Sequence, residues 1–178
     1  MSLRACCSLG SFFSSNDIAD AILFAVNNDA DIINASFGGP TNAPEIQSAL
    51  QYANDNGVLV IAAAGNYATN NDTTPLYPAN YDLPNIVSVG STNQQNNLAY
   101  FSNYGQSVDI TAPGVQVQTL GLNGTSQTLD GTSFSTPFVT SVAGRYLSQN
   151  PQLSAEEIKQ RIFTSAYNNP NLASNIHE

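Results

Sequence analysis

The chain has 178 residues, of which 42% are hydrophobic and only 10% are charged, and its formal net charge is −9. This length corresponds to one domain that buries about 70% of the surface of its unfolded chain. The excess of acidic groups disfavours nucleic acid as a partner, and no apolar run is long enough to predict a membrane span.

The first half of the sequence alternates extended and helical patterns. Residues 5–9 are short and apolar and predict a strand. Residues 14–28 begin with polar capping residues and continue with apolar residues at helical spacing, which predicts a helix. Residues 31–37 predict a second strand, and residues 44–56 predict a second helix. The run 57–64 is apolar without alternation, which is typical of a strand covered on both faces.

This order predicts a parallel sheet with helices on both sides, and therefore a three-layer α/β fold in one domain, residues 1–178. Ligands of such sheets bind beyond the carboxyl ends of the strands. Residues 36–40 and 65–66 follow two of the predicted strands. We therefore expect the functional site to lie where these two segments meet.

The second half adds further strands and two helices. Residues 86–89 predict a fourth core strand, and residues 100–114 predict a small β-hairpin. The long helix that follows is apolar on nearly every side, so we expect it to be buried. A Ser-Ala-Glu-Glu capping box at 154–157 predicts the last helix, and residues 168–178 are expected to form a loose tail.

The sequence Asp-Gly-Thr-Ser-Phe-Ser-Thr-Pro at 130–137 opens the long helix. Ser133 therefore lies at a helix N-terminus, where the dipole favours a hydroxyl that becomes alkoxide-like as it attacks a carbonyl. An amide held at a strand end, as expected for Asn66, can stabilise the resulting oxyanion. Taken alone, the serine could be an ordinary helix cap and the asparagine a left-handed loop residue.

Together, segments 36–40, 63–66 and 130–137 closely resemble the second half of the subtilisin-like serine protease (subtilase) family, and the resemblance covers nearly the whole chain. It implies a three-layer α/β/α fold with a mainly parallel sheet, without the family's N-terminal strands, and with a small β-hairpin. It also implies a serine endopeptidase that forms its acyl-enzyme on Ser133. Asn66 and the N–H group of Ser133 would then stabilise the oxyanion.

The resemblance also assigns residues to a peptide or protein substrate. The strand edge that pairs with the substrate backbone comprises Ser36, Phe37 and Gly38. The walls of the pocket for the residue before the cut bond, where small side chains imply room for a large apolar group, comprise Ala63, Ala64, Gly65, Tyr77 and Pro78. Thr132 is likewise expected to contact the substrate.

No cofactor is required by this interpretation, and no side-chain metal site is expected. Some family members bind a cation at backbone carbonyls that correspond to Ala79 and Tyr81, so calcium is an expectation from the resemblance. An extracellular location is implied in the same way.

The chain departs from the family in its catalytic triad. The family's aspartate and histidine precede the serine, and the only histidine here, His177, follows it. We therefore expect the chain alone to be inactive. We also expect residues 5–9 to form an open strand edge that pairs with a second copy or with a missing N-terminal fragment. The alternative is a peptide-binding module that has lost catalysis.

Overall fold

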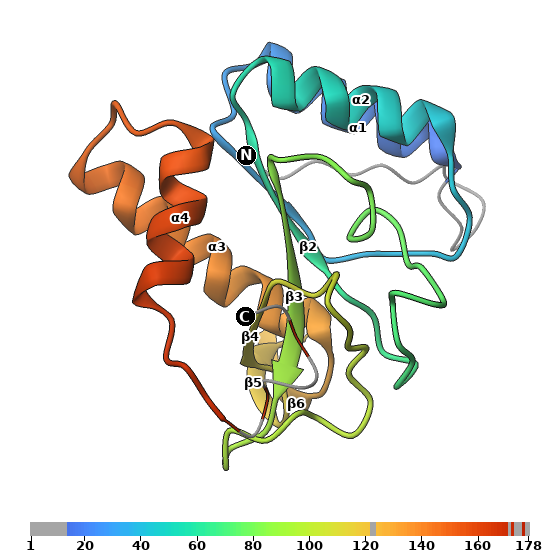
Figure 1. Cartoon of the computed structure of the whole chain (residues 1–178), viewed down its shortest axis with the longest axis vertical. Coiled ribbons are helices and arrows are strands. Elements are labelled where there is room, and N and C mark those ends of the chain that lie inside the picture. The colour runs from blue at the N-terminus through green and yellow to red at the C-terminus, as the bar shows by residue number, and fades with distance from the viewer. Residues whose placement is uncertain (1–13, 122–123, 171, 173–175, 177–178) are drawn as a thin grey trace.

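The computed structural model describes residues 14–121, 124–170, 172 and 176. Its elements, in chain order, are α1 (Ser15–Asn27), β1 (Ile32–Ala35), α2 (Pro44–Asp55), β2 (Leu59–Ala63), β3 (Ile86–Thr92), β4 (Ile110–Pro113), β5 (Val117–Leu120), β6 (Ser126–Leu129), α3 (Thr132–Gln149) and α4 (Ala155–Ser165). Helices α1 and α2 cover one face of a sheet, and α3 and α4 cover the other (Figure 1). The predicted three layers are therefore confirmed.

The sheet is parallel throughout, in the order β1-β2-β3-β4. In its register Ile33 lies beside Val60, and Val89 lies beside Ile110. Because the four strands run in the same direction, their carboxyl ends meet at one edge, and the segments that follow β1 and β2 are neighbours there. This is the α/β arrangement that the sequence predicted.

Strand β2 is the centre of the core, and all of its residues are buried. Val60 and Ala62 face α1 and α2, whereas Leu59 and Ile61 face α3 and α4. Burial of each larger side chain contributes about 1.5–3 kcal/mol relative to leaving it exposed. Because both faces of β2 are covered, its sequence is apolar without alternation, as predicted.

Helices α1 and α4 both begin with a capping box. At α4 the hydroxyl of Ser154 accepts a hydrogen bond from the N–H group of Glu157, and the carboxylate of Glu157 accepts one from the N–H group of Ser154. The N–H group and hydroxyl of Ser154 stabilise the ionised carboxylate, so the pKa of Glu157 is lowered. The predicted start of this helix is confirmed.

The small β-hairpin exists, but the predicted location at residues 100–114 is wrong. The end of that segment is β4, which pairs in parallel with β3, and the antiparallel pair is β5 with β6. An extended sequence pattern predicts a strand, but it does not predict which other strand it pairs with.

The middle of the segment 100–114 contacts the side chain of Asp72. The carboxylate of Asp72 accepts hydrogen bonds from the N–H groups of Gln106 and Ser107 at 2.8 and 2.9 Å. Burial opposes ionisation of Asp72, but these donors outweigh it and lower the pKa.

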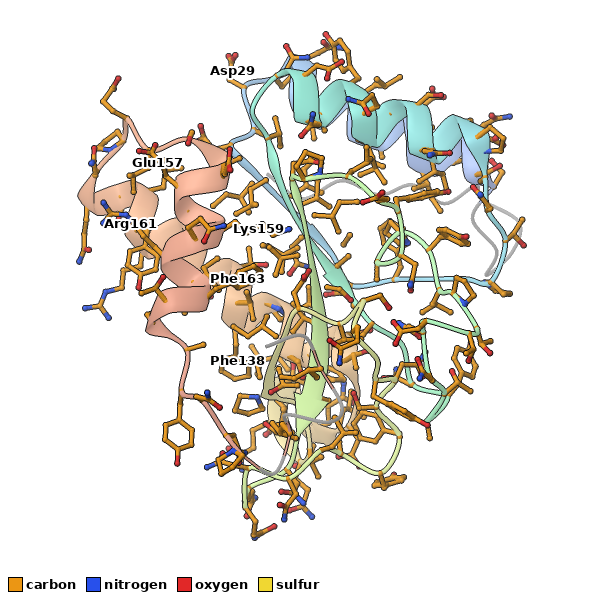
Figure 2. All side chains as sticks on the ribbon, in the orientation of Figure 1. Asp29, Phe138, Glu157, Lys159, Arg161 and Phe163 are labelled. Carbon is orange, nitrogen blue, oxygen red and sulfur yellow. The ribbon has the colours of Figure 1, made fainter. Side chains whose placement is uncertain are left out.

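Helix α3 is less buried than its sequence predicted. Val139 and Ala143 are buried against the sheet, but Phe138, labelled in Figure 2, is 47% exposed and Val142 is 41% exposed. The described elements cover only the side of α3 that faces the sheet and α4. The expectation of burial on every side is therefore wrong for this part of the helix.

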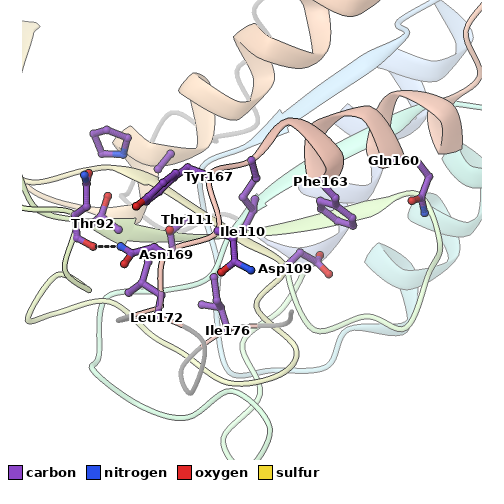
Figure 3. A pocket seen from close by; sticks show the side chains of 15 residues that line it. Thr92, Asp109, Ile110, Thr111, Gln160, Phe163, Tyr167, Asn169, Leu172 and Ile176 are labelled. Carbon is purple, nitrogen blue, oxygen red and sulfur yellow. Dashed lines mark hydrogen bonds between the residues drawn. The ribbon is translucent and has the colours of Figure 1, made fainter.

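The strand expected at residues 5–9 lies outside the described residues, as do several residues of the segment 168–178. In that segment, where a loose tail was expected, Leu172 is buried, and Asn169 donates a hydrogen bond to the carbonyl of Asn96 (Figure 3). Both tail residues line a cleft of about 660 Å³ beside β3, β4 and α4. Among the described helices, none is long and apolar enough to cross a membrane.

Gly114 is expected to tolerate no side chain. A β-carbon at this position would overlap the hydroxyl oxygens of Ser91 and Ser135 and would lie 2.8 Å from the carbonyl oxygen of Gly131. Because overpacking forces such neighbours apart, we expect Gly114→Ala to lower the free energy of unfolding by about 1–3 kcal/mol, as measured by urea denaturation.

Gly144, in the middle of α3, provides a matched control. A β-carbon there would meet no atom within 4 Å, so Gly144→Ala should raise the free energy of unfolding by about 0.5–1 kcal/mol through helix propensity alone. If the two alanine variants unfold at the same urea concentration, the close packing around Gly114 does not constrain the fold.

Candidate active site

The first turn of α3 lies against the carboxyl end of β1. The hydroxyl of Ser133 donates a hydrogen bond to the carbonyl oxygen of Ser36 at 2.9 Å, and the hydroxyl of Ser36 donates one to the carbonyl oxygen of Ser133 at 2.9 Å. The amide of Asn34 donates to the Ser36 hydroxyl oxygen at 2.8 Å and accepts from the hydroxyl of Thr140 at 2.8 Å. These contacts hold Ser133 in one position at the edge where parallel sheets bind ligands.

Asn66 follows β2 and reaches the same helix start. Its amide oxygen Oδ1 accepts hydrogen bonds from the backbone N–H and the hydroxyl of Thr132, both at 2.9 Å. A backbone N–H can only donate, so the amide oxygen faces Thr132 and the NH₂ group faces elsewhere. The side chain is exposed. Asn66 therefore presents a free donor group beside the residue that precedes Ser133.

A second donor is available at the same place. The N–H group of Ser133 lies in the first turn of α3, where N–H groups have no partner within the helix. The positive end of the helix dipole adds to its effect on a nearby negative charge. The side-chain amide and the backbone N–H expected to stabilise an oxyanion therefore lie beside Ser133, and that role stays a prediction.

Thr132, which is expected to contact substrate, is only 1% exposed, and that contact stays a prediction. Its hydroxyl donates to Asn66 and accepts a hydrogen bond from the N–H group of Gly65 at 3.3 Å. Thr132 therefore connects the end of β2 to the start of α3. These hydrogen bonds orient the amide of Asn66.

Two buried asparagines support this loop, and sequence reasoning missed both. Asn103 is 1% exposed, its amide oxygen accepts from the N–H group of Tyr67 at 2.8 Å, and its NH₂ group donates to the amide oxygen of Asn71 at 2.8 Å. Asn71 in turn donates to the carbonyl of Ala64 at 2.9 Å. These bonds hold the chain on both sides of Asn66. Asparagines are common throughout this sequence, so no pattern distinguished these two.

The expected pocket walls are brought together, but the space between them is filled. Ala63 and Ala64 are buried at the end of β2. On the other side, Gly39 and Tyr77 exchange two backbone hydrogen bonds of 2.9 Å. The side chain of Leu76 lies between these segments and is only 6% exposed. Leu76 therefore occupies part of the space between the expected walls, and the predicted room for a large apolar side chain stays a prediction. The predicted pairing of residues 36–38 with a substrate backbone, and the contacts expected of Pro78, stay predictions.

The backbone carbonyls expected to hold calcium, those of Ala79 and Tyr81, belong to residues that line the same cavity as Lys159. Ala79 and Tyr81 line a small cavity of about 220 Å³ together with Lys159. The ammonium group of Lys159 donates to the carbonyl oxygens of Ile86 at 2.6 Å and Pro84 at 3.3 Å, and Figure 2 shows this side chain extending from α4 towards the sheet. The charge of Lys159 disfavours a divalent cation in this cavity, whereas the carboxylates of Asp82 and Asp109, which also line it, favour one. The calcium ion therefore stays an expectation from the resemblance.

Within the described residues no three His, Cys, Asp or Glu side chains lie close enough to hold a metal ion. The only histidine, His177, lies outside the described residues. The hydroxyl of Ser133 donates to a carbonyl oxygen, which is too weakly basic to remove its proton. Among the described residues, the hydroxyl of Ser133 thus has no general base within hydrogen-bond reach.

We expect Asn103→Leu to lower the free energy of unfolding by about 2–4 kcal/mol, because it leaves the N–H group of Tyr67 and the amide of Asn71 without partners in a buried place. Urea denaturation gives the value. Asn42→Leu, at an exposed asparagine, is the matched control and should change stability by no more than about 0.5 kcal/mol. Comparable losses in both variants would contradict the network.

We also expect millimolar calcium to leave the thermal unfolding midpoint unchanged, because the ammonium group of Lys159 already places a positive charge in the cavity that Ala79 and Tyr81 line. Lys159→Met should lower the free energy of unfolding by about 1–3 kcal/mol through loss of charge-assisted hydrogen bonds. Arg161→Met, on the exposed side of α4, is the control. A saturable rise in the midpoint of the unaltered protein with calcium but not magnesium would show that the cation fits after all.

Comparison with known proteins places this geometry in a family. The model of the subtilase family, Peptidase S8, matches residues 2–177. Subtilisin NAT of Bacillus subtilis subsp. natto is 36% identical over 150 residues, which are 84% of this chain and 39% of that protein. M-protease of Shouchella clausii (strain KSM-K16) is 39% identical over 153 residues, which are 86% of this chain and 39% of that protein.

Solved structures agree with this result. A cold-adapted subtilisin-like serine proteinase matches with a TM-score of 0.84 and 28% identity, over 95% of this chain and 63% of that one. The prenylagaramide maturation protease PagA matches with a TM-score of 0.81 and 33% identity, over 92% of this chain and 62% of that one. The chain thus spans less than two thirds of these relatives' length. The sequence and structural matches together show that it belongs to the subtilase family.

Proposed function

We propose that this chain carries the nucleophile and the oxyanion hole of a serine endopeptidase that cuts peptide bonds through an acyl-enzyme on Ser133. The observation that supports this most is the pair of hydrogen bonds from Thr132 to the amide oxygen of Asn66, which leave the NH₂ group available beside Ser133. Membership of the subtilase family supports the same reaction class. The substrate would be a peptide or a protein.

In the proposed reaction the oxygen of Ser133 bonds to the carbonyl carbon of the substrate, and the carbonyl π electrons move to its oxygen. The NH₂ group of Asn66 and the N–H group of Ser133 then stabilise this oxyanion in place of water. When the tetrahedral species collapses, the carbon–nitrogen bond breaks and the amine leaves with a proton. Water then attacks the acyl carbon and loses a proton, and the same two donors stabilise the second oxyanion. The bond from this carbon to the oxygen of Ser133 breaks, the serine oxygen takes up a proton, and the acid leaves.

The proton of Ser133 has to reach a base, and the described residues offer none close to it. Without a base, a serine hydroxyl is a poor nucleophile, and loss of the catalytic group lowers the rate by about 10⁶-fold in a subtilisin. We therefore propose that catalysis depends on an aspartate and a histidine supplied from outside this chain. An N-terminal fragment docked at residues 5–9 is the proposed source, and those residues lie outside the described part of the chain. A second copy could pair with the same strand edge, but it would carry the same sequence and no further histidine than His177.

The absence of a base also supports a second candidate function. A chain that keeps the groove but has no base would bind peptides without cutting them. The two functions differ in what the complete gene encodes: the endopeptidase requires an Asp and a His-Gly-Thr segment in addition to these residues, and the binding module does not.

The test compares this chain alone with the full product of its gene, using a peptide amide whose cleavage releases a fluorophore. We expect negligible hydrolysis by the chain alone and measurable hydrolysis by the full product. In the full product, Ser133→Ala should abolish the activity, whereas Ser141→Ala, at an exposed serine of the same helix, should leave it unchanged.

Asn66→Ala in the full product should lower kcat by about 10²–10³-fold with little change in KM, the magnitude known for removal of such a donor from a subtilisin. The proposal would be refuted by serine-independent hydrolysis or by full activity of Ser133→Ala. Peptide binding without hydrolysis by the full product would instead establish the second function.

A further inference from the structure

The residue before α2 is held by a tyrosine from another part of the chain. Ala43 is the N-cap of this helix, and its side chain forms no capping hydrogen bond. The hydroxyl of Tyr81 donates to the carbonyl oxygen of Ala43 at 2.9 Å and accepts from the N–H group of Ala43 at 3.0 Å. Both residues are buried, and among the described residues only Tyr81 accepts from this N–H group. The phenol therefore attaches the start of α2 to the loop that follows β2.

Tyr81 is itself fixed in one place. Its side chain is 5% exposed and belongs to the core between the sheet and helices α1 and α2. The centroid of its ring lies 4.6 Å from that of Tyr77. Burial raises the pKa of the Tyr81 hydroxyl, so the group stays protonated and can donate and accept at the same time. A phenol held in this way restrains the chain to which it bonds.

The restrained chain is the segment 36–43, which joins β1 to α2. At its beginning Ser36 exchanges hydrogen bonds of 2.9 Å with Ser133. In its middle Gly39 exchanges two backbone hydrogen bonds of 2.9 Å with Tyr77, whose ring contacts that of Tyr81. Residues 36–38, predicted to pair with the backbone of a substrate, thus have the reactive serine at one end. The other end depends on the two tyrosines.

We propose that Tyr81 is a positioning residue for the peptide, which acts through Ala43 to keep residues 36–38 in place for pairing with the substrate backbone. The inference rests on the proposed peptidase or peptide-binding function. The nucleophile is held separately, because Ser36 bonds directly to Ser133 and to Asn34. Loss of the Tyr81 hydroxyl should therefore weaken binding of the peptide and leave the chemical step intact.

The test uses the full product of the gene and two peptides that differ only in the residue before the cut bond, alanine or phenylalanine. Tyr81→Phe keeps the ring and removes both hydrogen bonds to Ala43. KM should rise by about 5–10-fold and kcat should change by less than about twofold, because a contact made equally before and during the reaction affects KM alone. The rise should be the same for both peptides, because pairing of this kind involves the peptide backbone.

Tyr52→Phe is the matched control. The hydroxyl of Tyr52, within α2, donates to the amide oxygen of Asn27 at 3.0 Å, and the residue is 40% exposed. This variant also removes a phenol hydrogen bond, but from the outer side of the helix, and it should leave KM and kcat unchanged.

A double variant separates positioning from simple stabilisation of α2. Serine is a good N-cap, so Ala43→Ser combined with Tyr81→Phe should strengthen the start of the helix without restoring its link to the loop beyond β2. Thermal unfolding should show recovered stability, while KM stays raised. If Tyr81 only stabilised the helix, KM would return to its original value together with the stability.

The inference is overturned by an unchanged KM in Tyr81→Phe, by a fall in kcat instead, by a change confined to one peptide, or by recovery of KM in the double variant. If the full product cuts neither peptide, the endopeptidase proposal fails, and titration calorimetry of the chain alone tests the inference with the same peptides. Tyr81→Phe should then bind both about 5–10-fold more weakly. Equal affinities, or no binding by the unaltered chain, would overturn it.

Discussion

The two hydrogen bonds of 2.9 Å from Thr132 to the amide oxygen of Asn66 are the constraint on which the rest of the site depends. They join the end of β2 to the beginning of α3. The exchange of hydrogen bonds between Ser36 and Ser133 joins the end of β1 to the same turn. Helix α3 packs on the sheet through Val139 and Ala143, and its first turn is hydrogen-bonded to the ends of both β1 and β2. These contacts restrain the position of its first residues.

Beyond the end of β2, side-chain amides form hydrogen bonds to backbone groups of the loop. The chain leaves the regular sheet there, and its buried backbone groups still require hydrogen bonds. Asn71 and Asn103 provide them, and Asn80 continues the connection to the loop that carries Leu76. A fully bonded network of this kind is rigid, and removing one member leaves several groups unpaired. The same loop therefore positions the oxyanion donor and limits the space in front of it.

The sequence predicted those features that local chemistry determines. In α2 the apolar residues at helical spacing, Ile46, Ala49, Leu50 and Ala53, are the buried ones. The capping box of α4 and the buried central strand were predicted for the same reason. Partners distant in the chain were not predictable: the strand that β4 joins depends on the whole sheet, and the exposure of Phe138 depends on what covers α3.

The candidate site shows the same division. The motif around Ser133 and the position of Asn66 followed from the residues themselves. The burial of Thr132, the side chain of Leu76 in the pocket, and Lys159 beside the expected calcium carbonyls did not. In each case the outcome depends on a contact between segments that are distant in the sequence. The residue type at a single position does not predict such a contact.

The groups that surround Ser133 and Asn66 are hydroxyls, amides and carbonyls, all of them neutral. Dissolved ions screen interactions between charges over about 8 Å at physiological ionic strength, but they barely affect short contacts between dipoles. The chain also has few charged residues elsewhere that could transmit such an effect. The hydrogen-bonded arrangement of Ser133 and Asn66 should consequently be the same at low and at high salt concentration.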